Sequence, residues 1–459
     1  EEICDTENLE ILLRMRRSQA RPTIEPLEID ELPLFLATYQ GLASPGDSLE
    51  DLQNSLENLF GYPARAGLWE GDILSARLNP YYSSWLDTVL RDNELVWFGC
   101  GSERISFCFE SDYELFAFPP GDIEAAEDSK SQQKKEQQAV AAGLEELFSE
   151  TRGKFMLSDI MESLKFPSQE LVSSLWQLAW EGRISNDHFK TIRNGVMNRF
   201  KPEQLLPLTE VRKDGRRHGY GRGRRRIGFN RWQSTRAFAG NWYALPSFDD
   251  ESLEMDALDR QELVKDRIRQ LFMRYGVLFR EMLWNELPGF RWSNIFPVLR
   301  LMELSGEIVS GHFFKGIPGL QFCTPTALGW LTRGLPEDAI YWMNAVDPAS
   351  PCGIGLDELR PLFPHRLPTT HLVFHGKKLV LLSKKNGKEL IFNVDSDHPR
   401  IHDYLEFFKT LISREFQPLK YISVETVNEE SVLDSSYKEI LRDFGFKKDY
   451  KSMALMKEY

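Results

Sequence analysis

The chain has 459 residues with 42% apolar content, and its 69 Asp and Glu against 56 Lys and Arg give a net charge of −13. This length suits about three or four domains with cores of their own. Because no stretch is long and apolar enough for a membrane span and no signal peptide precedes the first helix, we expect a cytoplasmic protein without membrane contact.

The chain begins with a predicted helical lead-in and two helices, at residues 29–39 and 49–60. It starts at Glu1 rather than Met, which suggests a fragment or a processed product.

A repeated pattern organises the next three hundred residues. Residues 86–96, 175–185 and 299–309 each read as an amphipathic helix, a turn at Asn93, Gly182 or Gly306, and a short β-prone segment. Gly and Asn tolerate the left-handed conformation that ends a helix. Upstream, residues 153–164 parallel residues 276–283, with a short strand before the helix. Strand, helix, turn, helix and β wing are the order of a winged helix.

The segment between the second and third copies is strongly basic. Ten of the 25 residues from Arg212 to Arg236 are Lys or Arg, and only Asp214 is acidic. Five glycines lie among them from Gly215 to Gly228, together with aromatic residues. Guanidinium groups neutralise phosphates, and aromatic rings can stack on bases, so the pattern favours nucleic acid as partner. The alternative is a solvated loop, or one that pairs with the protein's own acidic surface.

Two further clusters lie where wings would start. Asn186 and Asp187 follow the second copy, where they predict either a turn bonded to its own backbone or a contact with DNA. In the third copy His312, Lys315 and Gln321 fit either the polar face of a hairpin or a ligand contact.

After Pro336 the pattern becomes β-rich. Residues 371–383 and 389–394 predict two strands around an Asn386-Gly387 turn. A helix at 402–413, a strand at 421–425, a helix at 435–443 and a strand at 452–456 follow. We therefore predict an α+β protein, in which a tandem array of winged-helix domains precedes a small β-barrel-like or α+β C-terminal module. The predicted segments are a helical lead-in (1–28), winged helix 1 (29–120), a polar linker (121–145), winged helix 2 (146–210), a basic Arg/Gly loop with a β segment (211–250), winged helix 3 (255–335) and the β-rich module (336–459).

Motifs for cofactor chemistry are absent from the sequence. No phosphate-binding glycine loop follows a strand, and no nucleophile motif of a hydrolase occurs. The five cysteines are scattered, with no C-x-x-C pair and no His at metal-ligand spacing. We expect no cofactor and no metal, and the catalytic residues, if any, are unknown.

A series of short motifs resembles the C-terminal region of the bacterial large helicase-related family of superfamily 2 DNA helicases. Two of them are Leu175-Trp-Gln-Leu-Ala-Trp-Glu-Gly-Arg-Ile-Ser-Asn-Asp and Asp347-Pro-Ala-Ser-Pro-Cys-Gly. The others lie, in the same order as in the family, at residues 35–42, 68–78, 90–99, 274–280, 316–322 and 445–446. The resemblance implies winged helices and a β module attached behind an ATPase core, whose motifs this chain lacks.

The same region is similar to winged-helix DNA glycosylases that act on alkylated or crosslinked bases, and the resemblance extends to activity on uracil. The Gln-centred motif of those enzymes has no counterpart in residues 58–65, just ahead of Glu70 and Asp72.

Two functions therefore compete. The favoured one is a non-motor region of a DNA repair helicase that binds DNA and supports assembly, with the helicase core of the same protein or a split partner, and possibly a second copy, as partners. The alternative is a DNA glycosylase acting on uracil or alkylated bases through a carboxylate in a pocket of the winged helices and β module. The candidate nucleic-acid-binding residues are Arg212, Lys213, Arg216, Arg217, Arg222, Arg224, Arg225, Arg226, Arg231, Asn186 and Asp187.

Overall fold

The computed structural model describes residues 25–117, 133–150, 153–201, 240–246 and 256–457, with a few isolated positions nearer the N-terminus. Within these residues no helix is both long and apolar enough to cross a membrane. The chain forms two compact units. Unit 1 comprises Glu1–Ala64, Leu68–Trp85 and Asp250–Tyr459, and unit 2 comprises Arg65–Gly67 and Leu86–Asp249.

Three of the sheets repeat one topology. Their strand orders are β1-β3-β2, β4-β6-β5 and β7-β9-β8, so that in each sheet the last strand of the copy lies in the middle. Helices flank the first strand, and the second and third strands form the wing, as in a winged helix. The predicted tandem array of winged helices is confirmed, whereas the exact domain boundaries stay predictions.

The first copy begins with α2 (Leu32–Tyr39) and α3 (Leu49–Asn58). Ser48 caps α3, since its hydroxyl accepts from the Asp51 backbone N–H while the Asp51 carboxylate accepts from the Ser48 backbone N–H. The remaining elements are β1 (Ala64–Arg65), α4 (Ala66–Leu68), a π-helical turn η2 (Trp69–Ile73), α5 (Leu74–Arg77), α6 (Ser83–Asp92), β2 (Leu95–Gly99), β3 (Arg104–Phe109) and the 3-10 turn η3 (Glu110–Leu115).

The polar segment predicted as a linker runs into the first helix of the second copy, and a helix that we did not predict follows its second strand. The elements are α7 (Gln133–Glu150), β4 (Phe155–Met156), α8 (Leu157–Leu164), α9 (Ser168–Trp180), β5 (Ile184–Asn186), α10 (Phe189–Asn198) and β6 (Asn241–Ala244).

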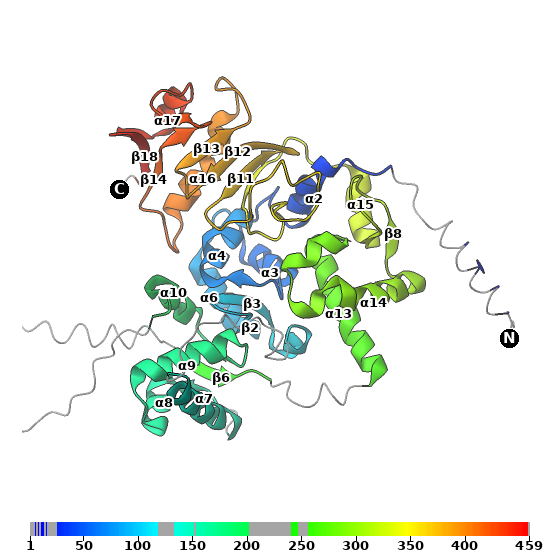
Figure 1. Ribbon diagram of the computed structural model, residues 1–459, viewed down its shortest axis with the longest axis vertical. Coiled ribbons are helices and arrows are strands. Elements are labelled where there is room, and N and C mark those ends of the chain that lie inside the picture. The colour runs from blue at the N-terminus through cyan, green and yellow to red at the C-terminus, as the bar shows by residue number, and fades with distance from the viewer. Residues whose placement is uncertain are drawn as a thin grey trace, which may run out of the picture. The chain divides into compact units, whose positions relative to one another are not determined.

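In the third copy two 3-10 turns stand where a helix was expected after the first strand, and Figure 1 labels its longer helices. The Asp256 side chain caps its first helix by accepting from the backbone N–H groups of Leu258 and Asp259. The elements are α13 (Ala257–Tyr275), β7 (Val277–Leu278), η4 (Arg280–Asn285), η5 (Pro288–Phe290), α14 (Trp292–Ser305), β8 (Val309–Gly311), β9 (Gln321–Cys323) and α15 (Pro325–Arg333).

The predicted left-handed turn is present in all three copies, but not always at the expected residue. Gly182 and Gly306 have φ angles of 73° and 82°. In the first copy the positive φ, 52°, belongs to Glu94, the residue after Asn93. The repeat therefore keeps the backbone bend while its position shifts by one residue.

The C-terminal module contains two open sheets. One has the order β10-β11-β12-β13-β15-β16 and the other β14-β18-β17, so no closed barrel forms among the described strands. The elements are β10 (Ile340–Asn344), β11 (His371–His375), β12 (Lys378–Lys384), β13 (Glu389–Phe392), α16 (Ile401–Ser413), β14 (Tyr421–Val424), β15 (Thr426–Val427), β16 (Glu430–Ser431), α17 (Lys438–Phe444), β17 (Lys447–Asp449) and β18 (Ser452–Met456).

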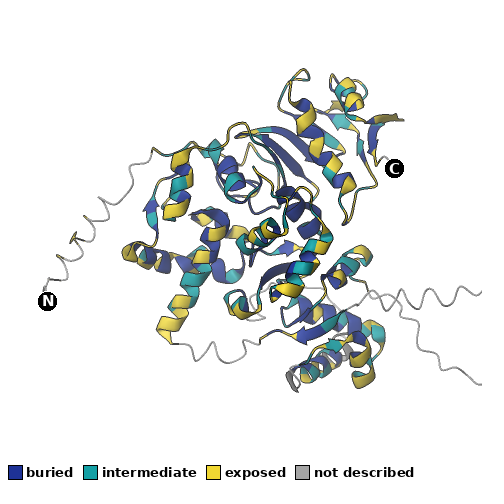
Figure 2. Ribbon diagram, turned by 180° about the vertical axis from the view of Figure 1, so that it is seen from behind, coloured by how far each residue is buried: buried dark blue, intermediate teal, exposed yellow. Residues whose placement is uncertain are grey.

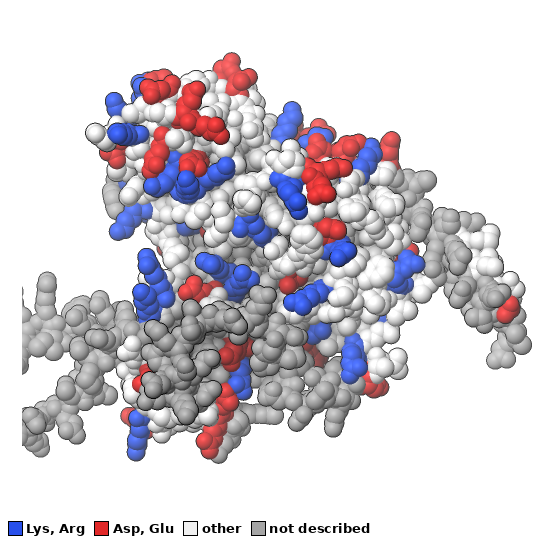
Figure 3. All heavy atoms as spheres, viewed as in Figure 1, with Lys and Arg blue, Asp and Glu red and all other residues white. Residues whose placement is uncertain are grey.

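The hairpin predicted around Asn386-Gly387 is confirmed, because Lys384 pairs with Glu389 across it. The preceding run, predicted as one strand, is itself a hairpin: His375 pairs with Lys378 around Gly376, whose φ is 55°. A hydrophobic core joins one face of α16 to the strands, and Figure 2 shows that helix buried on one side and exposed on the other. On the outer surface of the module, acidic and basic side chains are interspersed (Figure 3).

Candidate nucleic-acid interface

The wing of the second copy carries the basic sequence. Strands β5 and β6 pair antiparallel, with Ile184 opposite Ala244 and Asn186 opposite Trp242. The chain from residue 187 to residue 240 therefore leaves the sheet and returns to it at the same end of this strand pair. That connection holds 14 Lys and Arg against 4 Asp and Glu, a net charge of +10 in a chain of −13. A wing is thus the place where this protein concentrates its positive charge.

The base of the wing is fastened by one carboxylate. Asp187 accepts hydrogen bonds from the backbone N–H of Asn241 at 2.7 Å and from the Asn241 amide at 2.7 Å. Burial raises the pKa of Asp187, but these bonds and the contact with His188 outweigh it, and the pKa is lowered. Gly240 has a φ of 93°, and a Cβ there would lie 2.6 Å from the Asn186 side-chain oxygen. The two ends of the connection are therefore held in contact.

Asn186 forms a turn through hydrogen bonds of its side chain to neighbouring residues, which is one of the two roles predicted for it. Its side chain is buried, and its Oδ1 accepts from the His188 backbone N–H at 2.9 Å and from the Thr191 hydroxyl at 3.2 Å. These bonds favour a structural role for Asn186 and Asp187 at the wing base. Direct contact of either residue with DNA stays a prediction.

The other candidate residues lie outside the described residues. They are Arg212, Lys213, Arg216, Arg217, Arg222, Arg224, Arg225, Arg226 and Arg231. The structure shows that the segment containing them connects β5 to β6. Their role in binding nucleic acid stays a prediction.

The helices that would enter a DNA groove are not basic. In winged-helix and helix-turn-helix proteins the helix before the wing commonly reads bases. Here the corresponding helices α6, α9 and α14 have net charges of −1, −1 and 0. Pro297 lies within α14. A helix without net positive charge offers a phosphate backbone no net attraction, so any electrostatic attraction in the second copy would come from its wing.

Two polar residues in the wing of the third copy contact other residues of the same chain. The Gln321 side chain is fully buried, accepts from the backbone N–H groups of Phe313 and Phe314, and donates to the Phe314 carbonyl. Lys315 pairs with Glu28. The structural interpretation therefore accounts for Gln321 and Lys315.

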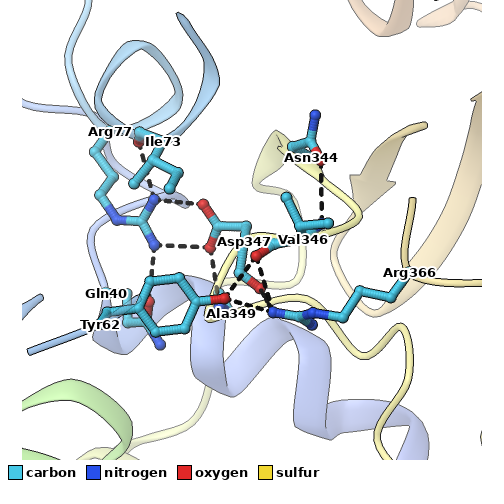
Figure 4. A network of polar contacts seen from close by, with 9 residues as sticks. All are labelled: Gln40, Tyr62, Ile73, Arg77, Asn344, Val346, Asp347, Ala349 and Arg366. Carbon is cyan, nitrogen blue, oxygen red and sulfur yellow. Dashed lines mark hydrogen bonds and ion pairs between the residues drawn. The ribbon is translucent and has the colours of Figure 1, made fainter. Parts of the chain in front are cut away.

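Sequence reasoning missed a buried polar network within unit 1. Arg77 and Asp347 form a two-pronged ion pair with N–O distances of 2.7 and 2.8 Å, and both side chains are almost fully buried (Figure 4). Arg77 also donates to the Ile73 carbonyl and the Gln40 side chain. A buried charge pair is favourable only when further hydrogen bonds satisfy it. The pair fastens the first winged helix to the segment that follows β10.

A second guanidinium completes this network. Arg366 donates to the Tyr62 hydroxyl at 2.6 Å and to the Val346 carbonyl at 2.8 Å, as Figure 4 shows. The Tyr62 hydroxyl donates to the same carbonyl. Burial, followed by the negative charges of Asp347 and Glu286, raises the pKa of Tyr62 despite the opposing effect of Arg366. Tyr62 and Arg366 therefore support the loop that carries Asp347.

The π-helical turn contributes two buried carboxylates near this network. Asp72 lies 2.7 Å from the His371 Nε2 and 3.6 Å from Arg414, and its side chain is 8% exposed. Burial raises the pKa of Asp72, but His371 and Arg414 outweigh this effect, and the net shift lowers the pKa. Glu70 accepts from the Tyr81 hydroxyl at 2.7 Å. Both carboxylates are thus paired with protein groups and shielded from solvent.

Metal and thiol chemistry find no support among the described residues. No group of three or more His, Cys, Asp or Glu there could hold a metal ion. Cys100, Cys108, Cys323 and Cys352 are free thiols. Burial raises the pKa of Cys323 to about 12 and of Cys352 to about 11, so neither thiol is poised as a nucleophile.

Comparison with known proteins gives two family matches. Residues 28–110 and 257–342 each match a winged-helix domain of the large helicase-related protein. A relative named Lhr helicase/uracil glycosylase, from Escherichia coli, is 25% identical over 95% of this chain and 29% of its own length. A relative from Mycolicibacterium smegmatis, named Lhr helicase/probable uracil glycosylase, is 24% identical over 87% of this chain and 26% of its own length. The chain thus spans less than a third of these relatives.

Among solved structures, Streptomyces sahachiroi DNA glycosylase AlkZ is similar with a TM-score of 0.48 and 11% identity, over 88% of this chain and 99% of that one. Likeness at this level carries no argument about function. The family matches and the relatives agree with the motifs of the sequence and with the repeated winged-helix topology. The chain is therefore similar to the large helicase-related proteins, and two of its segments match their winged-helix domains.

Proposed function

We propose that this chain is a non-motor, DNA-binding region of a large helicase-related protein. The observation that carries the proposal is the placement of a +10 connection between β5 and β6, at the wing of the second winged helix. Phosphate contacts supply most non-specific affinity for nucleic acid, and guanidinium groups suit them best. The relatives' names, which include helicase and glycosylase, support a protein that acts on DNA.

The mode of binding follows from the charges of the helices. Because α6, α9 and α14 carry no net positive charge, they add no net attraction for the phosphate backbone, and we assign the affinity to the wing. Binding through the wing is then largely independent of base sequence. The winged helices act as a scaffold that presents the wing, and their partners are DNA and a helicase core in the same protein or a separate chain. Self-association and a cytoplasmic location remain part of the proposal.

The test replaces six arginines of the basic segment together by Ala: Arg216, Arg217, Arg222, Arg224, Arg225 and Arg226. Each neutralised phosphate contributes a slope of roughly 0.7 to 0.9 to log K against log salt, so the slope should fall by about 4 to 5 if all six make contact. Fluorescence anisotropy with a labelled oligonucleotide at several salt concentrations measures the slope. Affinity should fall about equally for different sequences.

A thermal melt is the control for folding, and we expect its midpoint to stay unchanged, because charged side chains outside a core contribute little stability. An unchanged slope in a variant that melts like the wild type would remove the basic segment from the DNA contact.

A second candidate function is a DNA glycosylase, favoured by the names of both relatives. A glycosylase flips a base into a pocket, and a carboxylate can stabilise the developing positive charge on the sugar. The ionised, buried Asp72 is the described carboxylate that best suits this role, although His371 and Arg414 now occupy it.

The test incubates the chain with uracil-containing single- and double-stranded DNA, followed by alkali, and looks for strand cleavage. This activity would be established if the wild type cleaves the DNA and Asp72→Asn does not, while both bind DNA with the same affinity. Absence of cleavage by the wild type would leave binding as the function.

A further inference from the structure

We propose that helix α10 and the residues that end it form a second phosphate-binding surface for nucleic acid, with Lys190 in the helix and Arg199 and Lys201 just after it as its contacts. This inference rests on the proposed function and deepens it, because it assigns contacts on a described, folded element beside the basic segment. α10 lies directly after β5, at the start of the wing.

The inner face of α10 is firmly anchored within unit 2. Phe189 is buried and packs on Phe107, with ring centroids 5.6 Å apart. Arg193 donates to both carboxylate oxygens of Asp87, at 2.9 and 2.8 Å, and its side chain is only 12% exposed. Ile192 is fully buried. A helix fixed in this way presents a constant outer face.

The end of α10 is fixed by close packing. A Cβ on Gly195 would lie 2.3 Å from the ring of Phe200, so only glycine fits there. Phe200 in turn packs edge-on against Trp176 and Trp180, with centroids 4.9 and 4.8 Å away. This packing fixes the backbone at Phe200. The backbone positions of its two neighbours, Arg199 and Lys201, are therefore fixed as well.

The segment from residue 188 to residue 201 is basic. Lys190, Arg199 and Lys201 are exposed, and no acidic residue occurs from residue 188 to residue 201. None of the three cations forms an ion pair with another residue that the structure describes. Two carboxylates in contact with this segment or next to it, Asp187 and Asp87, are occupied by Asn241 and Arg193. Three cations without local carboxylates suit a partner that supplies negative charge.

Helix stability does not account for this arrangement. Cations near a helix C-terminus interact favourably with the helix dipole, which would suffice for Arg199 and Lys201. Lys190, however, lies in the first turn, where the dipole disfavours a positive charge. The helix dipole therefore does not account for Lys190, whereas an external anion would, and a nucleic-acid backbone is the polyanion for which the adjoining wing is already suited.

The experiment measures DNA binding by the full chain carrying Lys190→Ala, Arg199→Ala and Lys201→Ala together. If all three cations contact phosphates, the slope of log K against log salt should fall by about 2 to 3. The matched control replaces three exposed lysines of the C-terminal module, Lys378, Lys420 and Lys448, by Ala. The control removes the same charge and should leave the slope within error of the wild type.

The six-arginine variant, measured in parallel, separates the two proposals. If it loses slope while the α10 variant equals the control, the inference about α10 is overturned and the proposed function stands. If wild type binds no DNA, the proposed function fails, and the inference with it. Polyglutamate added as a competitor at matched charge tests the partner: displacement of DNA as effective as that by unlabelled DNA would overturn the assignment to nucleic acid.

Discussion

The wing of the second winged helix and the polar network of unit 1 both contain cationic side chains, but these side chains differ in burial and in pairing. In unit 1 the guanidinium groups of Arg77 and Arg274 are buried, and each pairs with an equally buried carboxylate, Asp347 or Glu286. In the wing, Lys190 and Arg199 are exposed and have no ion-pair partner among the described residues. The number of cations does not distinguish the regions. What distinguishes them is whether each cation has a carboxylate from its own chain.

This difference predicts two separable responses. Charges buried in pairs are shielded from salt, so changes to them alter the free energy of unfolding and leave binding to DNA unaffected. Exposed cations without partners contribute little to folding and strongly to salt-dependent association. A given residue should therefore affect either the free energy of unfolding or the salt dependence of DNA binding.

The largest effect on stability is expected for Asp347→Ala. The substitution leaves the Arg77 guanidinium buried without its carboxylate, which costs about 3 to 5 kcal/mol of unfolding free energy. Chemical denaturation measures the loss. Replacing both partners, as Arg77→Met with Asp347→Leu, should cost less than the single change, because no unpaired charge remains. A single variant as stable as the wild type would show that the network is not essential to the fold.

A smaller and pH-dependent effect is expected for Asp72→Asn. At neutral pH the variant loses the charged hydrogen bond to His371, worth about 1.5 to 3 kcal/mol. Because the pKa of Asp72 is lowered from 3.8 in the folded protein, its contribution is fully present above that value and is lost as the pH falls further, through the folded pKa. Denaturation curves of the two proteins should therefore converge in acid. A difference that stays constant down to pH 3 would contradict this role of the charge.

The sequence indicates these two regions unequally. The wing and the repeats were predictable, because glycine turns and helical periodicity are local signals carried by neighbouring residues. The network was not, because Arg77 and Asp347 are 270 residues apart and Asp72 and His371 are 299 apart. In the sequence, polar residues so far apart cannot be distinguished from ordinary surface residues, because only the fold brings them together. Helix α10 was missed for another reason: its apolar face is short, and the turn residues Asn186 and Asp187 suggested a β wing.

The wing base lies between the two regions and should respond in both measurements. Asp187→Ala removes the hydrogen bonds from the Asn241 backbone and amide groups, at a cost of about 1 to 2 kcal/mol. Since these bonds hold the two ends of the wing together, DNA affinity should also decrease, with the salt slope unchanged because no cation is lost. A reduced slope would instead indicate a rearranged wing.

The smallest effect is expected for Lys388→Ala, which breaks an exposed ion pair of unit 1. Lys388 lies 2.9 Å from Glu425, a distance similar to that of the buried pair, but the two side chains are 54% and 52% exposed. Hydration and salt compete with such a pair, and its side chains lose entropy when they meet. We therefore expect no measurable change in the denaturation midpoint and no change in the salt slope for DNA. Because distance and charge match those of Arg77 and Asp347, a clear loss of stability here would show that burial is not what separates the two kinds of pair.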